Sequence, residues 1–221
     1  MNGHLRVEVA RFTLSPLRSN CYVISSNREA VVIDPGWRQG LESVIEYIDS
    51  NGLRVTGIIA THGHFDHVMG VNALREATGA GFKIHELDVG LIEVSARRAE
   101  ELLGLKLEEP PEPDGTLREG DKIRVGSVEL EVIHTPGHTR GSITLVWDKL
   151  AFTGDTLFKG TIGRIDLPES SPKKMEESLR KLLQLSLQTT IYPGHGPPTT
   201  VTEEKAQNPF LARIARGEPL A

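Results

Sequence analysis

The stretch Thr61-His62-Gly63-His64-Phe65-Asp66-His67 places four side chains of metal-ligand type within six consecutive residues. It follows directly on VTGIIA at residues 55–60, a largely apolar run that is typical of a strand buried on both faces. Side chains two positions apart on an extended segment point the same way, so His62 and His64 can offer two imidazoles to one ion. The turn that follows changes the direction of the chain, so Asp66 and His67 point differently from His62 and His64. The motif therefore predicts a metal site at the carboxyl end of a buried strand.

Three further residues of ligand type each lie in a glycine-rich turn at the end of a predicted strand. They are His138 in Thr135-Pro136-Gly137-His138-Thr139, Asp155 in Thr153-Gly154-Asp155-Thr156, and His195 in Tyr192-Pro193-Gly194-His195. Seven candidate ligands are more than one ion needs. Two ions that share a bridging carboxylate would use all seven and leave room for a bridging hydroxide.

Period-two and β-branched segments predict strands along the rest of the chain, and apolar residues at helical spacing predict helices. The expected strands cover residues 5–12, 21–25, 30–34, 55–60, 82–85, 122–125, 128–133, 142–147, 150–154 and 189–192. One expected helix carries Leu41 to Ile48 on its apolar face and stops at Asn51-Gly52, and the others cover about 68–77, begin near Leu87, and cover about 172–185. Gly126-Ser127 and Asp148-Lys149 are predicted to close tight hairpins.

The second half of the chain repeats the plan of the first half and holds the expected partners of the first half's ligands. The proline-rich segment 109–113 is therefore interpreted as a loop within one domain, and residues 1–221 are expected to form that single domain. Strand meanders interleaved with crossover helices predict an α/β (α+β) fold, with two packed mixed sheets and helices outside them.

The composition argues against several classes of protein. The formal net charge is -5 and no run is rich in Lys and Arg, so a nucleic-acid partner is not expected. No stretch approaches the roughly 20 apolar residues of a membrane helix, and the first residues lack the apolar run of a secretory signal, so we expect a cytoplasmic protein without membrane partners. The single cysteine, Cys21, excludes an internal disulfide, and we expect it in the core. We expect His4, His85 and His134 to be ordinary core or surface residues.

Five motifs together identify a family. THGHFDH (61–67), TPGHTRGS (135–142), FTGDTLFKGTIGRID (152–166), YPGHGPPTT (192–200) and Asn208-Pro209-Phe210 occur in the order that the metallo-beta-lactamase superfamily shows. The sequence resembles that superfamily over nearly the whole chain, and within it the short, single-domain glyoxalase II-like hydrolases. The resemblance implies a four-layer αββα sandwich with its ligands in loops at one edge of the sheets. It also implies a first metal on His62, His64 and His138, a second on Asp66, His67 and His195, and a bridge by Asp155.

Charge suggests how such a centre would work. Two divalent ions offset by the carboxylates of Asp66 and Asp155, which we expect to be the catalytic carboxylates, would lower the pKa of bridging water and make hydroxide available as nucleophile. The ions would also polarise a carbonyl group and stabilise a departing thiolate. We therefore expect a small thioester as substrate, such as an S-2-hydroxyacyl thiol of the S-lactoylglutathione type. Zinc is the expected metal, with iron and manganese as alternatives, because mixed imidazole and carboxylate ligation accepts all three.

The chain departs from the glyoxalase II pattern around the substrate. Only about 25 residues follow His195, so the helical extension that helps hold glutathione is not expected, and of the usual substrate-contacting residues only a cation, Arg164, has a counterpart. Arg164, with Lys159 as the weaker candidate, could grip a substrate carboxylate, or Arg164 could instead pair with Asp166.

Other functions remain open at this point. The run from Gly163 to Asp166 is similar to that of persulfide dioxygenases, which would need one iron on His62, His138 and Asp155. A lactonase and a non-catalytic metal-binding scaffold are further alternatives, while β-lactamase and nuclease activities are less expected. The number of bound metal ions and the consumption of oxygen would distinguish the hydrolase from the dioxygenase.

Overall fold

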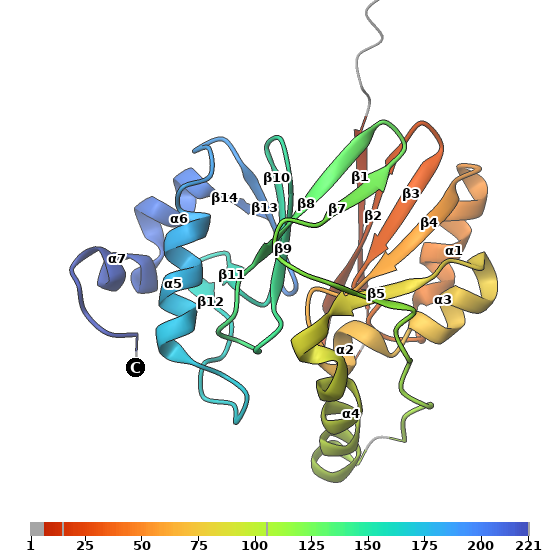
Figure 1. The fold of residues 1–221 in the computed structure, drawn as a ribbon, viewed down its shortest axis with the longest axis horizontal. Coiled ribbons are helices and arrows are strands. Elements are labelled where there is room, and N and C mark those ends of the chain that lie inside the picture. Colours follow the sequence, from red (N-terminus) through yellow and green to blue (C-terminus); the bar gives the residue numbers. More distant parts are fainter. Residues whose placement is uncertain (1–6, 15, 105, 221) are drawn as a thin grey trace, which may run out of the picture.

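A computed structural model describes residues 7–14, 16–104 and 106–220 of the chain. Two six-stranded sheets pack face to face, and helices cover the outer face of each one (Figure 1). This is the αββα arrangement that the sequence predicts. No helix among the described residues is long and apolar enough to cross a membrane.

The first sheet contains the N-terminal half of the chain, in the order β1-β2-β3-β4-β5-β6. Its first three strands form an antiparallel meander, and β3 to β6 run parallel because helices cross over between them. The strands are β1 (Val7–Leu14), β2 (Ser19–Ser26), β3 (Glu29–Ile33), β4 (Arg54–Ile59), β5 (Phe82–His85) and β6 (Gly115–Leu117). The helices of this half are α1 (Leu41–Ser50), α2 (Phe65–Val68), α3 (Val71–Thr78), the 3-10 turn η1 (Glu86–Asp88) and α4 (Val89–Leu103).

The second sheet contains the C-terminal half, in the order β14-β13-β10-β9-β8-β7. Both predicted hairpins are present, since Val125 pairs with Val128 and Trp147 pairs with Leu150. The strands are β7 (Lys122–Val125), β8 (Val128–His134), β9 (Ile143–Trp147), β10 (Leu150–Gly154), β13 (Thr190–Pro193) and β14 (Thr199–Thr200), with a separate hairpin of β11 (Leu157–Phe158) and β12 (Thr161–Ile162). The helices are α5 (Pro172–Leu182), α6 (Val201–Gln207) and α7 (Pro209–Ala215).

Three apolar clusters stabilise the layers. The central cluster lies between the two sheets and includes Tyr22 from the first sheet and Phe152 from the second, whose rings pack edge to face. A second cluster joins the first sheet to α1 and α3 and contains Cys21, which is fully buried and unpaired, as expected for a packing role. The third joins the second sheet to α5, α6 and α7, and buries Met175 and Leu179 completely.

Two predicted helices differ from the structure at their ends. The helix expected over 68–77 begins only at Val71, as α3, and the short helix α2 before it ends at Val68. Between them the backbone N–H of Gly70 donates to the carbonyl of Gly36, in the loop after β3, at 3.1 Å. A Cβ at Gly70 would lie 1.8 Å from the carbonyl oxygen of Pro35, so only glycine fits this crossing. Helix α5 ends at Leu182 instead of continuing to Leu185, because the chain then turns towards β13.

Candidate metal centre

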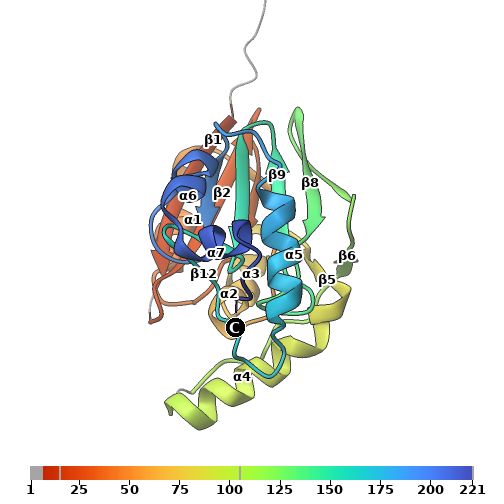
Figure 2. The same ribbon diagram turned by 90° about the vertical axis from the view of Figure 1, so that its left-hand side faces the viewer.

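The seven predicted ligands all follow the carboxyl ends of strands. His62 and His64 follow β4, Asp66 and His67 lie in α2 immediately after them, and His138, Asp155 and His195 follow β8, β10 and β13. These strand ends lie at one edge of the two sheets, where open α/β sheets commonly place their sites. In Figures 1 and 2, α2 and the projecting helix α4 mark that edge. The structure therefore brings together side chains that are distant in the chain, such as His67 and His195, which are 128 positions apart.

The first group of ligand atoms comes from His62, His64 and His138, whose nitrogens lie within 4.8 Å of one another. His138 Nε2 is 2.9 Å from His64 Nδ1, and the rings of His62 and His138 meet edge to face with their centroids 4.9 Å apart. His62 and His138 are buried, and His64 is only slightly exposed. Three converging imidazoles are a common ligand set for a divalent transition metal.

The second group comes from Asp66, His67 and His195, again with ligand atoms within 4.8 Å of one another. His67 Nε2 is 3.3 Å from His195 Nε2, and Asp66 Oδ2 is 3.2 Å from the same atom of His195. His67 is fully buried, whereas the side chain of His195 is 28% exposed and is the most open member of the cluster. The second group can therefore be reached from solvent on the His195 side.

Asp155 lies between the two groups. Its Oδ2 is 3.5 Å from His138 Nε2 in the first group and 3.6 Å from His195 Nε2 in the second, and its Oδ1 is 3.6 Å from His67 Nε2. Space beside it is kept open by Gly194, because a Cβ there would lie 2.1 Å from Asp155 Oδ1. This central position suits a carboxylate that touches two ions.

Two buried atoms of the cluster show that metal ions fit it. His62 Nε2 and Asp155 Oδ1 are shielded from solvent and have no hydrogen-bond partner. Buried polar atoms are normally paired, since leaving one unpaired costs about 1–3 kcal/mol. Both atoms face the centre of the cluster, so bound ions would supply the missing partners. The seven residues are therefore suited to binding metal ions.

Outer residues set which nitrogen of each ring faces the centre. Asp34 Oδ2 lies 3.1 Å from His67 Nδ1, so His67 presents Nε2, and Glu169 Oε1 lies 2.9 Å from His64 Nε2, so His64 presents Nδ1. The Nδ1 of His138 donates to the backbone carbonyl of Arg164 over 3.0 Å. Such partners orient metal-binding histidines and strengthen them as ligands. Sequence reasoning missed Asp34 and Glu169, although Asp34 stands at a strand end, as Asp155 does.

A buried aspartate joins the two halves of the site. Asp88, at the start of α4, accepts hydrogen bonds from the backbone N–H of Gly63 at 2.9 Å, from Thr139 Oγ1 at 2.6 Å and from the N–H of Gly141 at 2.7 Å. Gly63 lies between two histidines of the first motif, and Thr139 follows His138. Asp88 therefore holds two ligand segments from different sheets in a fixed relation.

The charges of the cluster favour a cation at its centre. Burial lowers the pKa of His62 well below its usual value, and the neighbouring histidine rings lower it further, so this ring is neutral and free to bind a metal. Burial also disfavours the charged form of His67, but the carboxylates of Asp66 and Asp155 outweigh it and raise the pKa of His67 to about 10. Carboxylates that stabilise the positive charge of a protonated His67 ring attract a metal ion for the same reason.

The two predicted substrate-binding cations lie outside the ligand cluster. The guanidinium of Arg164 makes two 2.9 Å hydrogen bonds to Asp166, with both side chains exposed, and only its backbone carbonyl contacts a predicted ligand, His138. Lys159 lies 3.8 Å from Glu203 and is half exposed. The pairing of Arg164 with Asp166 is the alternative that the sequence left open, and substrate contacts by Arg164 and Lys159 stay predictions.

The remaining histidines do not enter the cluster among the residues that the structure describes. His85 and His134 stack on each other with ring centroids 4.3 Å apart, and burial lowers the pKa of His85 to about 4. His4 lies outside the described residues.

Comparison with known proteins gives the family. The model of the metallo-beta-lactamase superfamily matches residues 14–195, which include all seven candidate ligands. The chain belongs to this superfamily.

Individual relatives span nearly the whole chain. A protein of Haemophilus influenzae named hydroxyacylglutathione hydrolase GloC is 35% identical over 204 residues, which cover 90% of this chain and 95% of the relative. The probable metallo-hydrolase YqgX of Bacillus subtilis is also 35% identical, over 91% of this chain and 96% of the relative.

Solved structures of related proteins have the same fold. TTHA1623, in a di-iron-bound form, is 38% identical, with a TM-score of 0.82 over 91% of this chain and 100% of that chain. The B3 metallo-beta-lactamase BLEG-1 is 32% identical, with a TM-score of 0.85 over 92% and 99%. ETHE1 from Myxococcus xanthus is 29% identical, with a TM-score of 0.76 over 93% and 84%.

Proposed function

We propose that the protein is a dinuclear metal-dependent hydrolase of small thioesters, with zinc as its expected metal and iron or manganese as alternatives. The observation that carries the proposal is the position of Asp155 between two complete groups of ligand atoms. The Haemophilus influenzae relative, named for thioester hydrolysis, and the di-iron form of TTHA1623 support it.

The residues of the chain divide the work. Bound metal ions would supply a water of lowered pKa and polarise the thioester carbonyl. His62, His64 and His138 would hold one ion, Asp66, His67 and His195 the other, and Asp155 both. Asp34 and Glu169 orient the rings, so the ligand atoms are in place before substrate arrives. The partly exposed side of His195 is where a substrate can enter.

The test begins with metal content. Mass spectrometry of protein purified without chelator is expected to give about two ions per chain, and release of thiol from S-D-lactoylglutathione is expected to follow. Substitution of the central ligand, Asp155→Ala, should lower metal content and abolish thiol release, while Asp49→Asn on the exposed face of α1 should change neither. A fully loaded protein that releases no thiol from a panel of thioesters would overturn the proposal. A β-lactam and a lactone in the same panel test the activities of other superfamily members.

A persulfide dioxygenase is the second candidate, favoured by the likeness to ETHE1 from Myxococcus xanthus and by Gly163-Arg164-Ile165-Asp166. It would use one iron on His62, His138 and Asp155. One iron per chain, with oxygen consumed when glutathione persulfide is added, would establish this function in place of the hydrolase.

A further inference from the structure

A cavity of about 420 Å³ opens beside His195, the most exposed of the candidate metal ligands. Its lining includes the side chains of Arg11 and Arg18 together with Asn20 and Gly196, and none of its lining residues is acidic. The chain as a whole carries a net charge of -5, so a cavity lined by two arginines and by no acidic residue differs from the average surface of the protein.

The wall of this cavity is held against the His195 turn. Asn20 donates its backbone N–H to the carbonyl of Gly194 at 2.7 Å and its side-chain amide to the carbonyls of Pro193 at 2.9 Å and Gly196 at 2.8 Å. Arg11 Nη1 donates to the carbonyl of Gly196 at 3.1 Å. The cavity is therefore formed before a ligand binds, and the remaining N–H groups of Arg11 are available to it.

Arg18 has no such partner. It lies at the turn between β1 and β2, is exposed, and makes no hydrogen bond or ion pair with any of the residues that the structure describes. Arginine offers paired donors that match the two oxygens of a carboxylate. A ligand in this cavity can thus meet the unused guanidinium of Arg18 and also the side chain of His195, because both residues line it.

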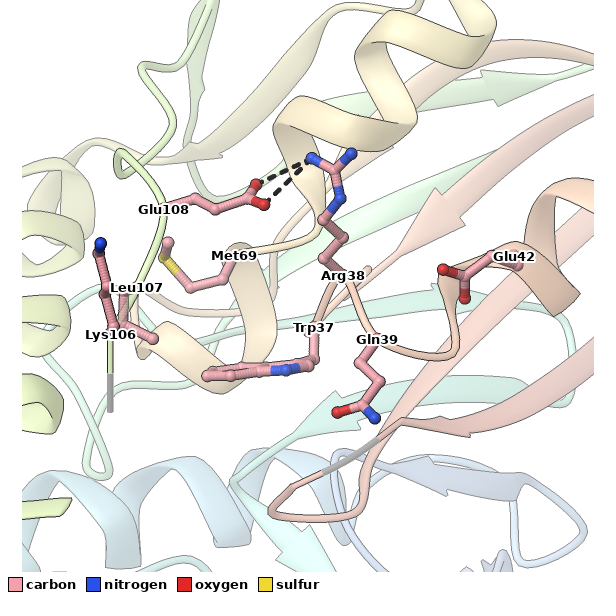
Figure 3. A pocket seen from close by; sticks show the side chains of 8 residues that line it. All are labelled: Trp37, Arg38, Gln39, Glu42, Met69, Lys106, Leu107 and Glu108. Atoms are coloured by element: carbon pink, nitrogen blue, oxygen red, sulfur yellow. Dashed lines mark hydrogen bonds and ion pairs between the residues drawn. The ribbon is translucent and has the colours of Figure 1, made fainter. Parts of the chain in front are cut away.

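A second cavity offers a comparison, because its arginine is paired with a carboxylate. Trp37, Met69 and Arg38 line a hollow of about 320 Å³ in which Arg38 points at Glu108 and is held 3.1 Å from both of its carboxylate oxygens (Figure 3). Glu42 and Lys106 also line it, so two acidic residues offset two basic ones in this cavity. The cavity beside His195 lacks these counterions in its lining.

We propose that the cavity beside His195 binds the carboxylate-bearing thiol half of the substrate, with Arg11 and Arg18 as specificity-determining residues. The inference rests on the proposed thioester hydrolysis. It names the substrate class as thioesters of a carboxylate-bearing thiol, in preference to thioesters of a neutral thiol.

Binding can be measured apart from turnover. S-methylglutathione is a thioether that cannot be hydrolysed, and its diethyl ester differs only in lacking free carboxylates. Isothermal titration calorimetry on the metal-loaded protein is expected to give a Kd at least about tenfold lower for the diacid, because charge-assisted hydrogen bonds to the arginines are lost in the ester. Arg11→Gln and Arg18→Gln should each raise the Kd of the diacid by about fivefold and leave the Kd of the diester unchanged.

The matched control is Arg140→Gln, an exposed arginine that lines a cavity on the other side of the cluster, next to Glu169. It should leave both affinities unchanged. In turnover, Arg18→Gln should raise the KM for S-D-lactoylglutathione with kcat unchanged, and should not affect S-lactoyl-N-acetylcysteamine, whose thiol is neutral.

The possible failures are distinguishable. Equal affinity for diacid and diester, or a diacid preference that survives both arginine substitutions, would overturn the inference while thioester turnover stands. A preference lost in Arg140→Gln would also overturn it and assign the carboxylate to the other cavity. Arginine-dependent binding of the diacid without turnover of any thioester would uphold the anion site and refute the hydrolase.

Discussion

Asp34 shows how a residue that is not a ligand can control the metal centre. Its Oδ1 accepts the backbone N–H of Thr61 at 2.7 Å, and its Oδ2 accepts Thr61 Oγ1 at 2.7 Å and faces His67 Nδ1 at 3.1 Å. One buried carboxylate thus positions the start of the ligand motif and the last ring within it.

Replacing this carboxylate by an amide is expected to weaken metal binding. In Asp34→Asn one oxygen becomes a donor, which cannot accept the proton of His67 or of Thr61, so we expect metal affinity to fall about 10- to 100-fold. Competition with a chromophoric chelator measures it. The exposed variant Asp49→Asn is the control, and an Asp34→Asn protein with undiminished affinity would contradict the assigned role.

At the scale of single residues, the sequence was more informative about candidate ligands than about their supports. His62 to His67 are close in the chain, and His138, Asp155 and His195 each stand at a strand end, so all seven could be found by pattern. Glu169 could not, because it lies in a loop with no motif around it and reaches His64 only through the fold, 105 positions away. Arg11 and Arg18 were missed as well, because only the fold places them beside His195.

Among the elements, helix α4 has a role that its amphipathic pattern does not indicate. Asp88 at its start accepts three hydrogen bonds from the two ligand segments and is only 1% exposed. Burial raises the pKa of this carboxyl group, against the lowering effect of its donors.

Removing the carboxylate should destabilise the junction of the sheets. In Asp88→Ala the donors of Gly63, Thr139 and Gly141 lose their acceptor, and we expect the free energy of unfolding to fall by about 3 kcal/mol. Urea denaturation measures this. Asp121→Ala is the matched control, because Asp121 also accepts a backbone N–H, that of Arg118, but at an exposed turn where water can replace it. Equal losses of unfolding free energy in the two variants would show that Asp88 contributes no more to stability than an exposed hydrogen-bond acceptor does.

The elements themselves were largely predictable, because period and turn chemistry are local. The strand at 82–85 and both hairpin turns agree with the structure. The break at Gly70 was not predictable, since the helical pattern continues through it and the backbone N–H of Gly70 meets its acceptor, the carbonyl of Gly36, only in the folded chain. Helices α6 and α7 were not predicted either, although Asn208 caps α7 by accepting the N–H of Phe210, as an Asn-Pro pair at a helix start would suggest.

Over the whole molecule, the cluster of seven candidate ligands joins the two sheets. Bound metal should therefore stabilise the fold as well as take part in catalysis. Without it, the carboxylates of Asp66 and Asp155 stay close together with only protons to offset them. An ion at 1,000 times its Kd adds about 4 kcal/mol of stability, which corresponds to roughly 10 °C in Tm for a domain of this size.

Chelation is therefore expected to lower the Tm by about that amount, and resupplied zinc should restore it. Differential scanning calorimetry with and without chelator measures the shift. The control is His195→Ala. Its Tm should be lower than that of the unchanged protein before chelation, and chelation should lower it by less. A Tm that does not move when the metal is removed would contradict a shared structural role for the centre.

The distribution of ligands along the chain also has a consequence for biosynthesis. His64 and His138 are 74 positions apart, and His67 and His195 are 128 positions apart. A ribosome therefore releases the first four ligands long before their partners exist. The nascent chain can hold no complete centre until both sheets have been made, so metal acquisition must come at the end of synthesis or after it, when the cell's pool of available ions decides which metal enters.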